Sequence, residues 1–199
     1  MTYLLRLVAC LFVLLSLNVK ALVVNGCTIE PYAACPGADL SSADLANANL
    51  TNANLSLAFL SDANLSGANL SHAELFEADV SYADLSEANL YYADLFGAKF
   101  YDANLSEANL SNANLSNAKL TGAALQDANL SSANLSFADL SGAYVYSALY
   151  NDQTIFPSDF DPIAAGMINA SPVPLPAGIY LFLSGLVGLV VTRFSRRGA

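Results

Sequence analysis

The chain has 199 residues, of which 55% are hydrophobic, 12% are charged and none is tryptophan. It is too hydrophobic for a disordered chain, which has few apolar residues and a high net charge. All seventeen acidic residues lie between Glu30 and Asp161, where Lys99 and Lys119 are the only bases, so this stretch has a net charge of 2 − 17 = −15. Such a charge argues against direct binding to nucleic acid or to an anionic membrane.

An export signal is expected at the N-terminus. Arg6 precedes an apolar run from Leu7 to Leu17, and compact residues stand three and one positions before a cut placed after Ala21. We interpret residues 1–21 as a signal peptide that signal peptidase removes. The alternative is a buried core helix, because the apolar run is too short to span a bilayer. Cys10 is not expected to be lipidated, since most of the apolar run follows it.

Two further cysteines, Cys27 and Cys35, follow the predicted cut. An even number of cysteines in an exported segment indicates a disulfide. In the chain-entropy model a bond closing such a short loop stabilises the fold by roughly 2–3 kcal/mol. We expect residues 22–37 to form an N-terminal cap held by this bond.

A five-residue repeat fills the middle of the chain. Alanine recurs at every fifth position from Ala38 to Ala148, and the 110 residues from Ala38 to Ser147 hold 110 / 5 = 22 units of the form Ala-(Asp/Asn)-Leu-x-x. The residue two positions after each alanine, here called the centre residue, is leucine except at three places, which are Val80, Phe100 and Val145.

A period of five fits neither a helix nor a flat strand. On an α-helix the leucines would spiral around the axis, and in a strand they would alternate between faces. All of them can share one interior only if the chain bends after every fifth residue, and Asn, Asp, Ser and Gly around each bend support turns. Four such sides close a square coil of twenty residues, so that each centre residue stacks on the one twenty positions later.

These units resemble the pentapeptide-repeat family over residues 38–150. The resemblance implies an all-β fold, a right-handed quadrilateral β-helix with the alanine and the centre residue inward and the other three positions outward. The residues themselves include no Gly-rich phosphate loop, no His/Cys metal spacing and no nucleophile beside a base, so we expect no catalytic residue, metal or cofactor. With four units per coil, 22 units predict 5.5 coils, about 26 Å tall at the strand spacing.

The repeat pattern breaks after Tyr150, and residues 151–163 are expected to cap the last coil through Phe156, Phe160 and Ile163. The run of Thr, Phe and Pro in this segment is similar to one that follows other repeat arrays of this family. We expect residues 164–172 to be a linker.

Residues 173–199 are expected to hold a membrane-sorting signal. The apolar segment from Leu175 to Thr192 would span about 27 Å as a helix, just enough for a thin bilayer. Arginines after it indicate that the tail ends on the cytoplasmic side and that the preceding chain lies outside. The motif residues are Val173, Pro174, Leu175, Pro176, Ala177, Arg193, Arg196 and Arg197.

This order of proline motif, apolar helix and arginines resembles the PEP-CTERM sorting signal, in which an exosortase cuts near the motif. Leu175 stands where that signal has Glu, so the resemblance is to the Val-Pro-Leu-Pro-Ala variant. A plain single-pass anchor is the alternative. The resemblance implies a Gram-negative host and a protein of the cell envelope, the outer surface or the extracellular space.

Outward side chains offer no catalytic constellation that we recognise. His72 is the only histidine and is expected to be solvated, and the acids are interpreted as a solubilising surface. Five asparagines one coil apart are expected to form an amide ladder as in stacked β-structures. These are Asn49, Asn69, Asn89, Asn109 and Asn129.

A belt of outward aromatic residues is the predicted ligand surface, because aromatic faces beside acids suit sugar rings. We expect Phe76 and Phe96, twenty residues apart, to stack at one corner with Leu57 near them. The alternative is that this pair only stabilises the stack. The predicted patch consists of Phe76, Tyr82, Tyr91, Tyr92, Phe96 and Tyr101.

The sequence thus favours an exported scaffold of the cell surface or of an extracellular polysaccharide matrix, with polysaccharide or a surface protein as its partner. A second hypothesis is an acidic DNA mimic that binds a topoisomerase, as in some members of the resembled family, but such a target is cytoplasmic. A glycan-processing enzyme is a third class, and it would need a pair of carboxylates about 5–10 Å apart.

Overall fold

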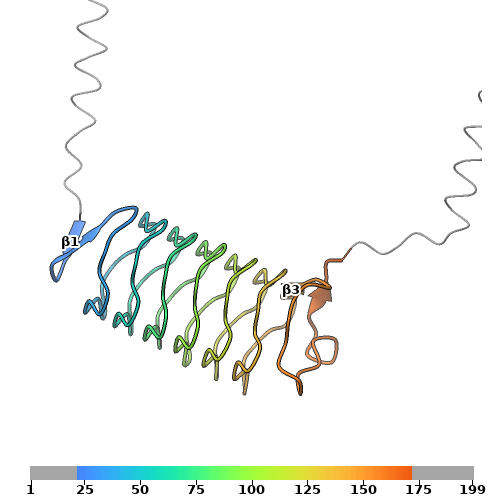
Figure 1. Ribbon diagram of the computed structural model, residues 1–199. Helices are drawn as coiled ribbons and strands as arrows, with labels where there is room; N and C mark the ends of the chain where they lie inside the picture. The colour runs from blue at the N-terminus through green and yellow to red at the C-terminus, as the bar shows by residue number, and fades with distance from the viewer. Residues whose placement is uncertain (1–21, 172–199) are drawn as a thin grey trace, which may run out of the picture.

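A computed structural model describes residues 22–171 as one stack of similar coils (Figure 1). Backbone bridges join residues twenty apart in parallel, from Ala34 with Asn54 to Asn129 with Leu149. The expected β-helix with four five-residue sides per coil is therefore confirmed. In the described residues no helix is long and apolar enough to cross a membrane.

One coil, residues 86–105, illustrates why the five-residue unit forms a straight side and a corner. Asn89 donates its N–H to the carbonyl of Ala68 in the preceding coil (2.9 Å), and Leu90 donates to that of Asn109 in the next (2.8 Å). The carbonyl of Leu90 also accepts the N–H of Ala93 (3.0 Å), which closes a β-turn. The third residue of that turn, Tyr92, has φ 56°, as type II turns require.

The aspartate or asparagine of each unit closes the same bend. Asn89 Oδ1 accepts the N–H of Tyr91, two residues later (3.3 Å), and Asn109 and Asn129 accept those of Ser111 and Ser131 in the same way. A short polar side chain thereby supports the turn that follows it. This contact explains why Asn or Asp so often precedes the centre residue.

Alanines and centre residues fill the interior, as expected. The centre residues from Leu40 to Leu135 are at most 1% exposed, and so are the alanines from Ala53 to Ala133. Burying each leucine side chain contributes about 1.5–3 kcal/mol before the entropy of ordering the chain is subtracted. The interior of the described coils is therefore one continuous apolar column.

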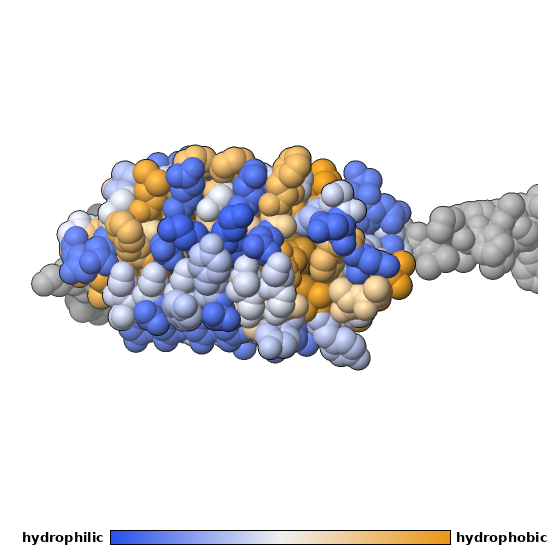
Figure 2. Space-filling model, turned by 90° about the horizontal axis from the view of Figure 1, so that it is seen from below, coloured by the Kyte–Doolittle hydropathy of each residue, from blue (hydrophilic) through white to orange (hydrophobic). Residues whose placement is uncertain are grey.

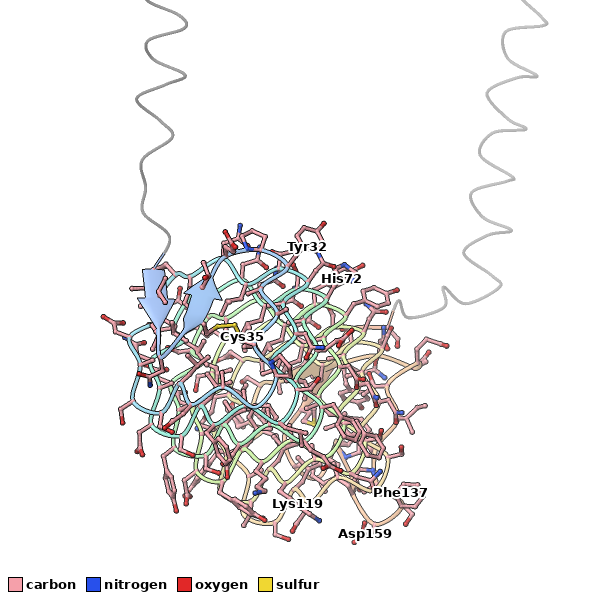
Figure 3. The ribbon with its side chains drawn as sticks, turned by 60° about the vertical axis from the view of Figure 1, so that its left-hand side comes forward. Tyr32, Cys35, His72, Lys119, Phe137 and Asp159 are labelled. Carbon is pink, nitrogen blue, oxygen red and sulfur yellow. A yellow bond between two sulfur atoms is a disulfide. The ribbon has the colours of Figure 1, made fainter. Side chains whose placement is uncertain are left out.

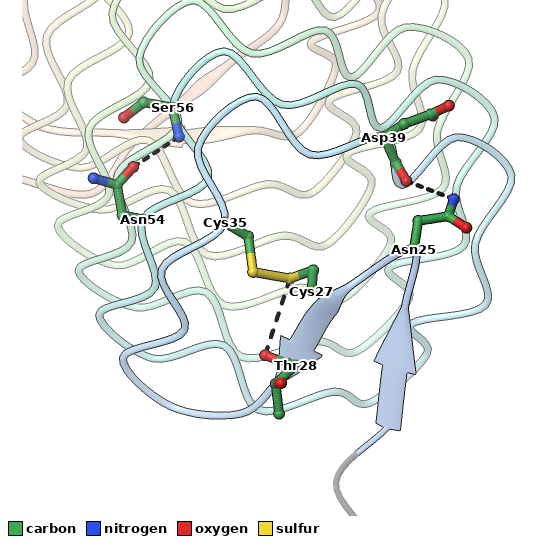
Figure 4. Close-up of a disulfide and its surroundings, with 7 residues drawn as sticks. All are labelled: Asn25, Cys27, Thr28, Cys35, Asp39, Asn54 and Ser56. Atoms are coloured by element: carbon green, nitrogen blue, oxygen red, sulfur yellow. Dashed lines mark hydrogen bonds between the residues drawn. A yellow bond between two sulfur atoms is a disulfide. The ribbon is translucent and has the colours of Figure 1, made fainter.

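A hairpin covers the N-terminal end of this column. Strand β1 (Leu22–Val24) pairs antiparallel with β2 (Cys27–Ile29) through a turn at Asn25 and Gly26. Both turn residues have positive φ, 47° and 84°, as a tight two-residue hairpin turn needs. Asn25 Nδ2 donates to the carbonyl of Asp39 (2.8 Å), which ties the hairpin to the first coil (Figure 4).

Cys27 and Cys35 are joined by a disulfide with a Cα–Cα distance of 5.6 Å (Figure 4). Cys35 occupies a centre position, because its N–H donates to the carbonyl of Asn54 (2.8 Å) and its neighbour Ala34 bridges Asn54. Both cysteines are buried. The disulfide therefore links the hairpin covalently to the N-terminal end of the apolar column.

At the C-terminal end the chain departs from the period. Strand β3 (Leu149–Tyr150) is followed by a segment with one additional residue, so that Ile155 bridges Asn134 across 21 positions. Phe156 contacts the ring of Tyr150 (centroids 5.6 Å apart) and that of Phe160 (5.3 Å). These two phenylalanines cap the last coil as expected.

Two expectations about this end are wrong. Ile163 is 77% exposed and covers nothing. The expected linker at 164–172 is not a linker over its described part, residues 164–171, because strand β4 (Ile168–Asn169) pairs parallel with β3 and Met167 is buried. Ile168 donates its N–H to the carbonyl of Ala148 (2.9 Å), so this segment satisfies the open edge of the last coil.

Candidate binding surfaces

The coil geometry assigns each outward residue to one of four sides or four corners. In chain order, residues 86–87 form one corner, 88–90 a side, 91–92 the next corner, 93–95 a side, 96–97 a third corner and 98–100 a side. The corner at 101–102 and the side after it complete the coil. Residues twenty apart share a position, and Figure 2 shows hydrophobic and hydrophilic side chains interleaved on one face of the stack.

The six aromatic residues of the predicted belt lie at three different corners. Phe76 and Phe96 share one corner, Tyr91 and Tyr92 the preceding one, and Tyr82 lies with Tyr101 at the following one. A three-residue side separates neighbouring corners. These are the corners that the spacing predicts, and the sides between them divide the aromatic residues of the belt into separate clusters.

The first cluster, the Phe corner, consists of Phe76 and Phe96. Their rings stack with centroids 5.5 Å apart and planes 6° from parallel, as the sequence predicted. Beside them lies an open groove of about 550 Å³. Its lining residues are Leu57, Phe59, Glu77, Asp79, Phe96, Gly97, Lys99 and Asn117.

Phe59 is a part of this groove that the sequence analysis missed. It occupies the position before a centre residue, where most units have Asn or Asp, and it is 54% exposed. Leu57 at the corner is 52% exposed. A phenylalanine in place of the usual turn-supporting residue was the available signal.

Two of the residues that line the groove, Lys99 and Asp79, form an ion pair. Lys99 Nζ lies 3.3 Å from Asp79 Oδ2, and Asp79 Oδ1 accepts hydrogen bonds from the hydroxyl and the N–H of Ser81 (2.6 and 3.3 Å). Partial burial alone would raise the pKa of Asp79, but the bonds from Ser81 and the ammonium of Lys99 outweigh it and hold that pKa below its ordinary value. The carboxylate therefore stays charged at neutral pH.

The second cluster, the Tyr–His corner, consists of His72, Tyr91 and Tyr92. The imidazole of His72 stacks on Tyr92 (5.5 Å, 7°) and meets Tyr91 edge to face (5.7 Å, 88°), while the two tyrosine rings contact each other (4.6 Å, 85°). His72 is exposed, as expected, but its stacking was not foreseen. Figure 3 places His72 on the other side of the stack from Lys119, which follows Lys99 by one coil.

Tyr82 and Tyr101 at the third corner are joined through the backbone. Tyr82 donates its N–H to the carbonyl of Tyr101 (2.8 Å), and both side chains reach solvent. Neither residue lines the groove beside the Phe corner.

The predicted amide ladder forms in part. Asn89 Nδ2 donates to Asn69 Oδ1 (3.3 Å), and Asn109 Nδ2 donates to Asn89 Oδ1 (3.1 Å). At the ends of the row, Asn49 Oδ1 accepts the hydroxyl of Thr51 (2.7 Å) and Asn129 Oδ1 accepts the N–H of Ser131 (3.0 Å). The ladder is therefore a feature of the middle of the stack.

Within residues 22–171, no three His, Cys, Asp or Glu side chains gather to hold a metal ion. The predicted signal peptide, residues 1–21, lies outside the described residues. So do the expected sorting motif, Val173–Ala177, and the arginines that follow it.

Comparison with known proteins gives one family and several structures. The family model described as pentapeptide repeats matches in eight copies over residues 35–71, 73–112 and 108–144. No curated protein sequence matches the chain.

Two similar solved structures are pentapeptide repeat proteins. One comes from the thylakoid lumen of Arabidopsis thaliana, with 35% identity over 45% of this chain and 66% of that chain and a TM-score of 0.38. The other comes from Nostoc, with 39% identity over 53% of this chain and 84% of that chain and a TM-score of 0.29. A third structure, QnrB1, is a plasmid-mediated fluoroquinolone resistance protein, with 20% identity over 80% of this chain and 87% of that chain and a TM-score of 0.40.

Proposed function

Because this chain belongs to the pentapeptide repeat family, we propose that it is a non-catalytic interaction scaffold, exported to the cell surface or to an extracellular polysaccharide matrix. The leader and tail patterns support export, with signal peptidase and an exosortase-like protease as the processing partners. The charge of −15 between Glu30 and Asp161 supports a soluble surface that repels nucleic acid. The right-handed coil that the family resemblance implies completes the proposed architecture.

The groove beside the Phe corner is the observation that carries this proposal. On a stack whose outward positions are mostly polar, Leu57, Phe59 and Phe96 expose apolar surface together, beside the ion pair of Lys99 and Asp79. Exposed apolar patches of this kind mark interaction sites. Apolar rings next to charges of both signs suit a segment of a surface protein, because such a segment brings both apolar and charged side chains.

The test is binding of the purified full chain to washed cells of a producing strain that lacks its gene. Phe76→Ser/Phe96→Ser should weaken binding about thirtyfold, since aromatic anchors at an interface centre contribute about 2 kcal/mol or more. Phe137→Ser is the matched control, because Phe137 lies at the same corner, is 79% exposed and does not line the groove. Treating the cells with protease should abolish binding of the unaltered chain.

Unchanged binding of the Phe76→Ser/Phe96→Ser variant, at an unchanged melting temperature, would remove the groove from the proposal. Finding the chain in the cytosol of producing cells, with its leader intact, would overturn export. These two readouts are independent, so each part of the proposal can fail alone.

The DNA-mimic hypothesis retains one favourable observation. Glu87, Glu107 and Asp127 follow one another at the same corner, one coil apart and exposed, so they form a row of negative charge. A gyrase supercoiling assay distinguishes the two functions. The scaffold proposal expects no effect of the purified chain on supercoiling, whereas a DNA mimic would inhibit or protect the enzyme.

A further inference from the structure

The side that carries the amide ladder differs from the others in its charge. Its outward residues are Asn49, Asn69, Asn89 and Asn109, then Asn129 and Leu149, so it carries no ionisable group. Each of the other three sides carries at least two carboxylates. This asparagine side therefore presents neutral polar groups on an otherwise acidic stack.

The middle of the asparagine side has hydrogen-bonding capacity left over. A side-chain amide has two N–H donors. Asn89 and Asn109 each use one N–H in the ladder, and both side chains remain partly exposed. The second N–H of each side chain has no protein acceptor within the described residues, so it is left for solvent or a ligand. Neighbouring donors repeat at the strand spacing of about 4.8 Å.

The two edges of this side differ in chemistry. One edge is the Tyr–His corner, where Tyr91 and Tyr92 are 37% and 50% exposed. It is continuous with the ladder, because Asn89 Oδ1 accepts the N–H of Tyr91. The opposite edge is the row of exposed carboxylates at Glu87, Glu107 and Asp127, with Glu87 only two residues before Asn89.

We propose that the asparagine side with its two edges binds a neutral polysaccharide chain. Sugar hydroxyls accept hydrogen bonds from the free amide N–H groups and donate to the carboxylates, whereas the apolar faces of pyranose rings pack on the tyrosines. An extended glycan also repeats its hydroxyl groups along its length, just as the amide ladder repeats its N–H donors along the stack. An acidic polysaccharide lacks this fit, because the carboxylate edge repels it.

This inference deepens the proposed scaffold function by naming a ligand class and a second surface. It depends on neither the Phe corner nor export. The two proposals can therefore fail separately, since the binding test on cells uses Phe76 and Phe96 and the test below uses different residues and purified polymers.

Native gel electrophoresis of the purified full chain tests the proposal, with the gel containing hydroxyethylcellulose, laminarin, galactomannan or, as the anionic comparison, alginate. At least one of the three neutral polymers should retard the chain, and alginate should not. Retardation should persist at high salt, because no ion pair is involved. Retardation by none of the neutral polymers, or equal retardation by alginate, would overturn the inference.

Paired variants locate the surface. Tyr91→Ser/Tyr92→Ser should weaken retardation about tenfold through the loss of two packing rings. Tyr82→Ser/Tyr101→Ser, the same change at a corner that does not border the asparagine side, should leave it unchanged. Equal behaviour of these two variants would contradict the assignment.

Asn89→Asp keeps the side chain's size and the oxygen that accepts the N–H of Tyr91, so the turn should survive. It removes both amide N–H donors, including the one given to Asn69 Oδ1, and adds a charge, so we expect weaker retardation together with a slightly lower melting temperature. Full retardation of the Asn89→Asp variant would show that the amide row does not contact the polymer.

Discussion

The middle of the stack and its ends stabilise the same column in different ways. A coil in the middle, such as the one at Leu90, has bridged coils on both sides, and its centre residue has no exposed surface. The end coils have a neighbour on one side only, and they are closed by a disulfide-linked hairpin and by a segment that leaves the period. Regular stacking therefore provides stability in the middle, whereas the ends depend on individual contacts.

The largest expected effect lies in the middle. Leu110→Asp places an unpaired carboxylate in the apolar column, where each coil depends on its neighbours, and should cost about 3 kcal/mol or more. Asn112→Asp is the matched control, because Asn112 faces outward and Asp tolerates its positive φ of 61°. Thermal unfolding of both variants measures the difference, and similar melting temperatures would refute the inward assignment.

The N-terminal end is expected to be the next most sensitive. Cys27→Ser/Cys35→Ser removes the disulfide and should destabilise the first coil by roughly 2–3 kcal/mol. Hydrogen exchange should accelerate at the amide of Leu40, which donates to Phe59, and remain unchanged at that of Leu110. Faster exchange throughout the stack would instead mean that the stability of the middle coils depends on the N-terminal cap.

At the C-terminal end one hydroxyl joins two segments, residues 130–132 and 151–154. Thr154 Oγ1 donates to the carbonyl of Leu130 (3.0 Å) and accepts the N–H groups of Asn151 and Ser132 (3.0 and 3.1 Å). Thr154→Val keeps the shape and leaves the N–H of Asn151 without its acceptor, whereas Ser132 N–H still donates to Asn151 Oδ1 and the carbonyl of Leu130 still accepts the N–H of Ala133. The substitution should therefore cost about 1–3 kcal/mol. Urea unfolding measures this cost, and Thr121→Val, at a corner in the middle, should cost less.

The smallest effect concerns pH. The pKa of Asp79 is held below its ordinary value in the folded chain, so its charged form favours folding above about pH 4, and this contribution is lost as the pH falls through the folded pKa. Asp79→Asn should be less stable than the unaltered chain at neutral pH by under about 1 kcal/mol, and equal to it in acid. A larger gap in acid than at neutral pH would contradict this sign.

The interior could be predicted because a period of five leaves a single way to bury every leucine. The ends could not, because the extra residue before Ile155 and the pairing of Ile168 with Leu149 depend on contacts between distant segments. The binding surfaces were predicted only in part. Stacking of Phe76 on Phe96 and the corner at which each tyrosine of the belt lies follow from the twenty-residue period.

The sequence analysis also missed two places where side chains from different coils or sides come together. Phe59 enters the groove from a side, and His72 stacks on Tyr92 from the neighbouring coil. Sorting outward residues by their position within a twenty-residue coil would have placed both beside the aromatic residues that they join.

The most direct test of the account is a pair of engineered disulfides. Ser66→Cys/Ser86→Cys joins residues twenty apart at one corner, where Gly67 donates its N–H to the carbonyl of Ser86 (2.8 Å), and the strand spacing of about 4.8 Å suits a disulfide. Ser71→Cys/Ser86→Cys joins neighbouring corners. Peptide mass spectrometry under non-reducing conditions should find the first bond and not the second, and equal formation of both would contradict the twenty-residue, four-sided coil.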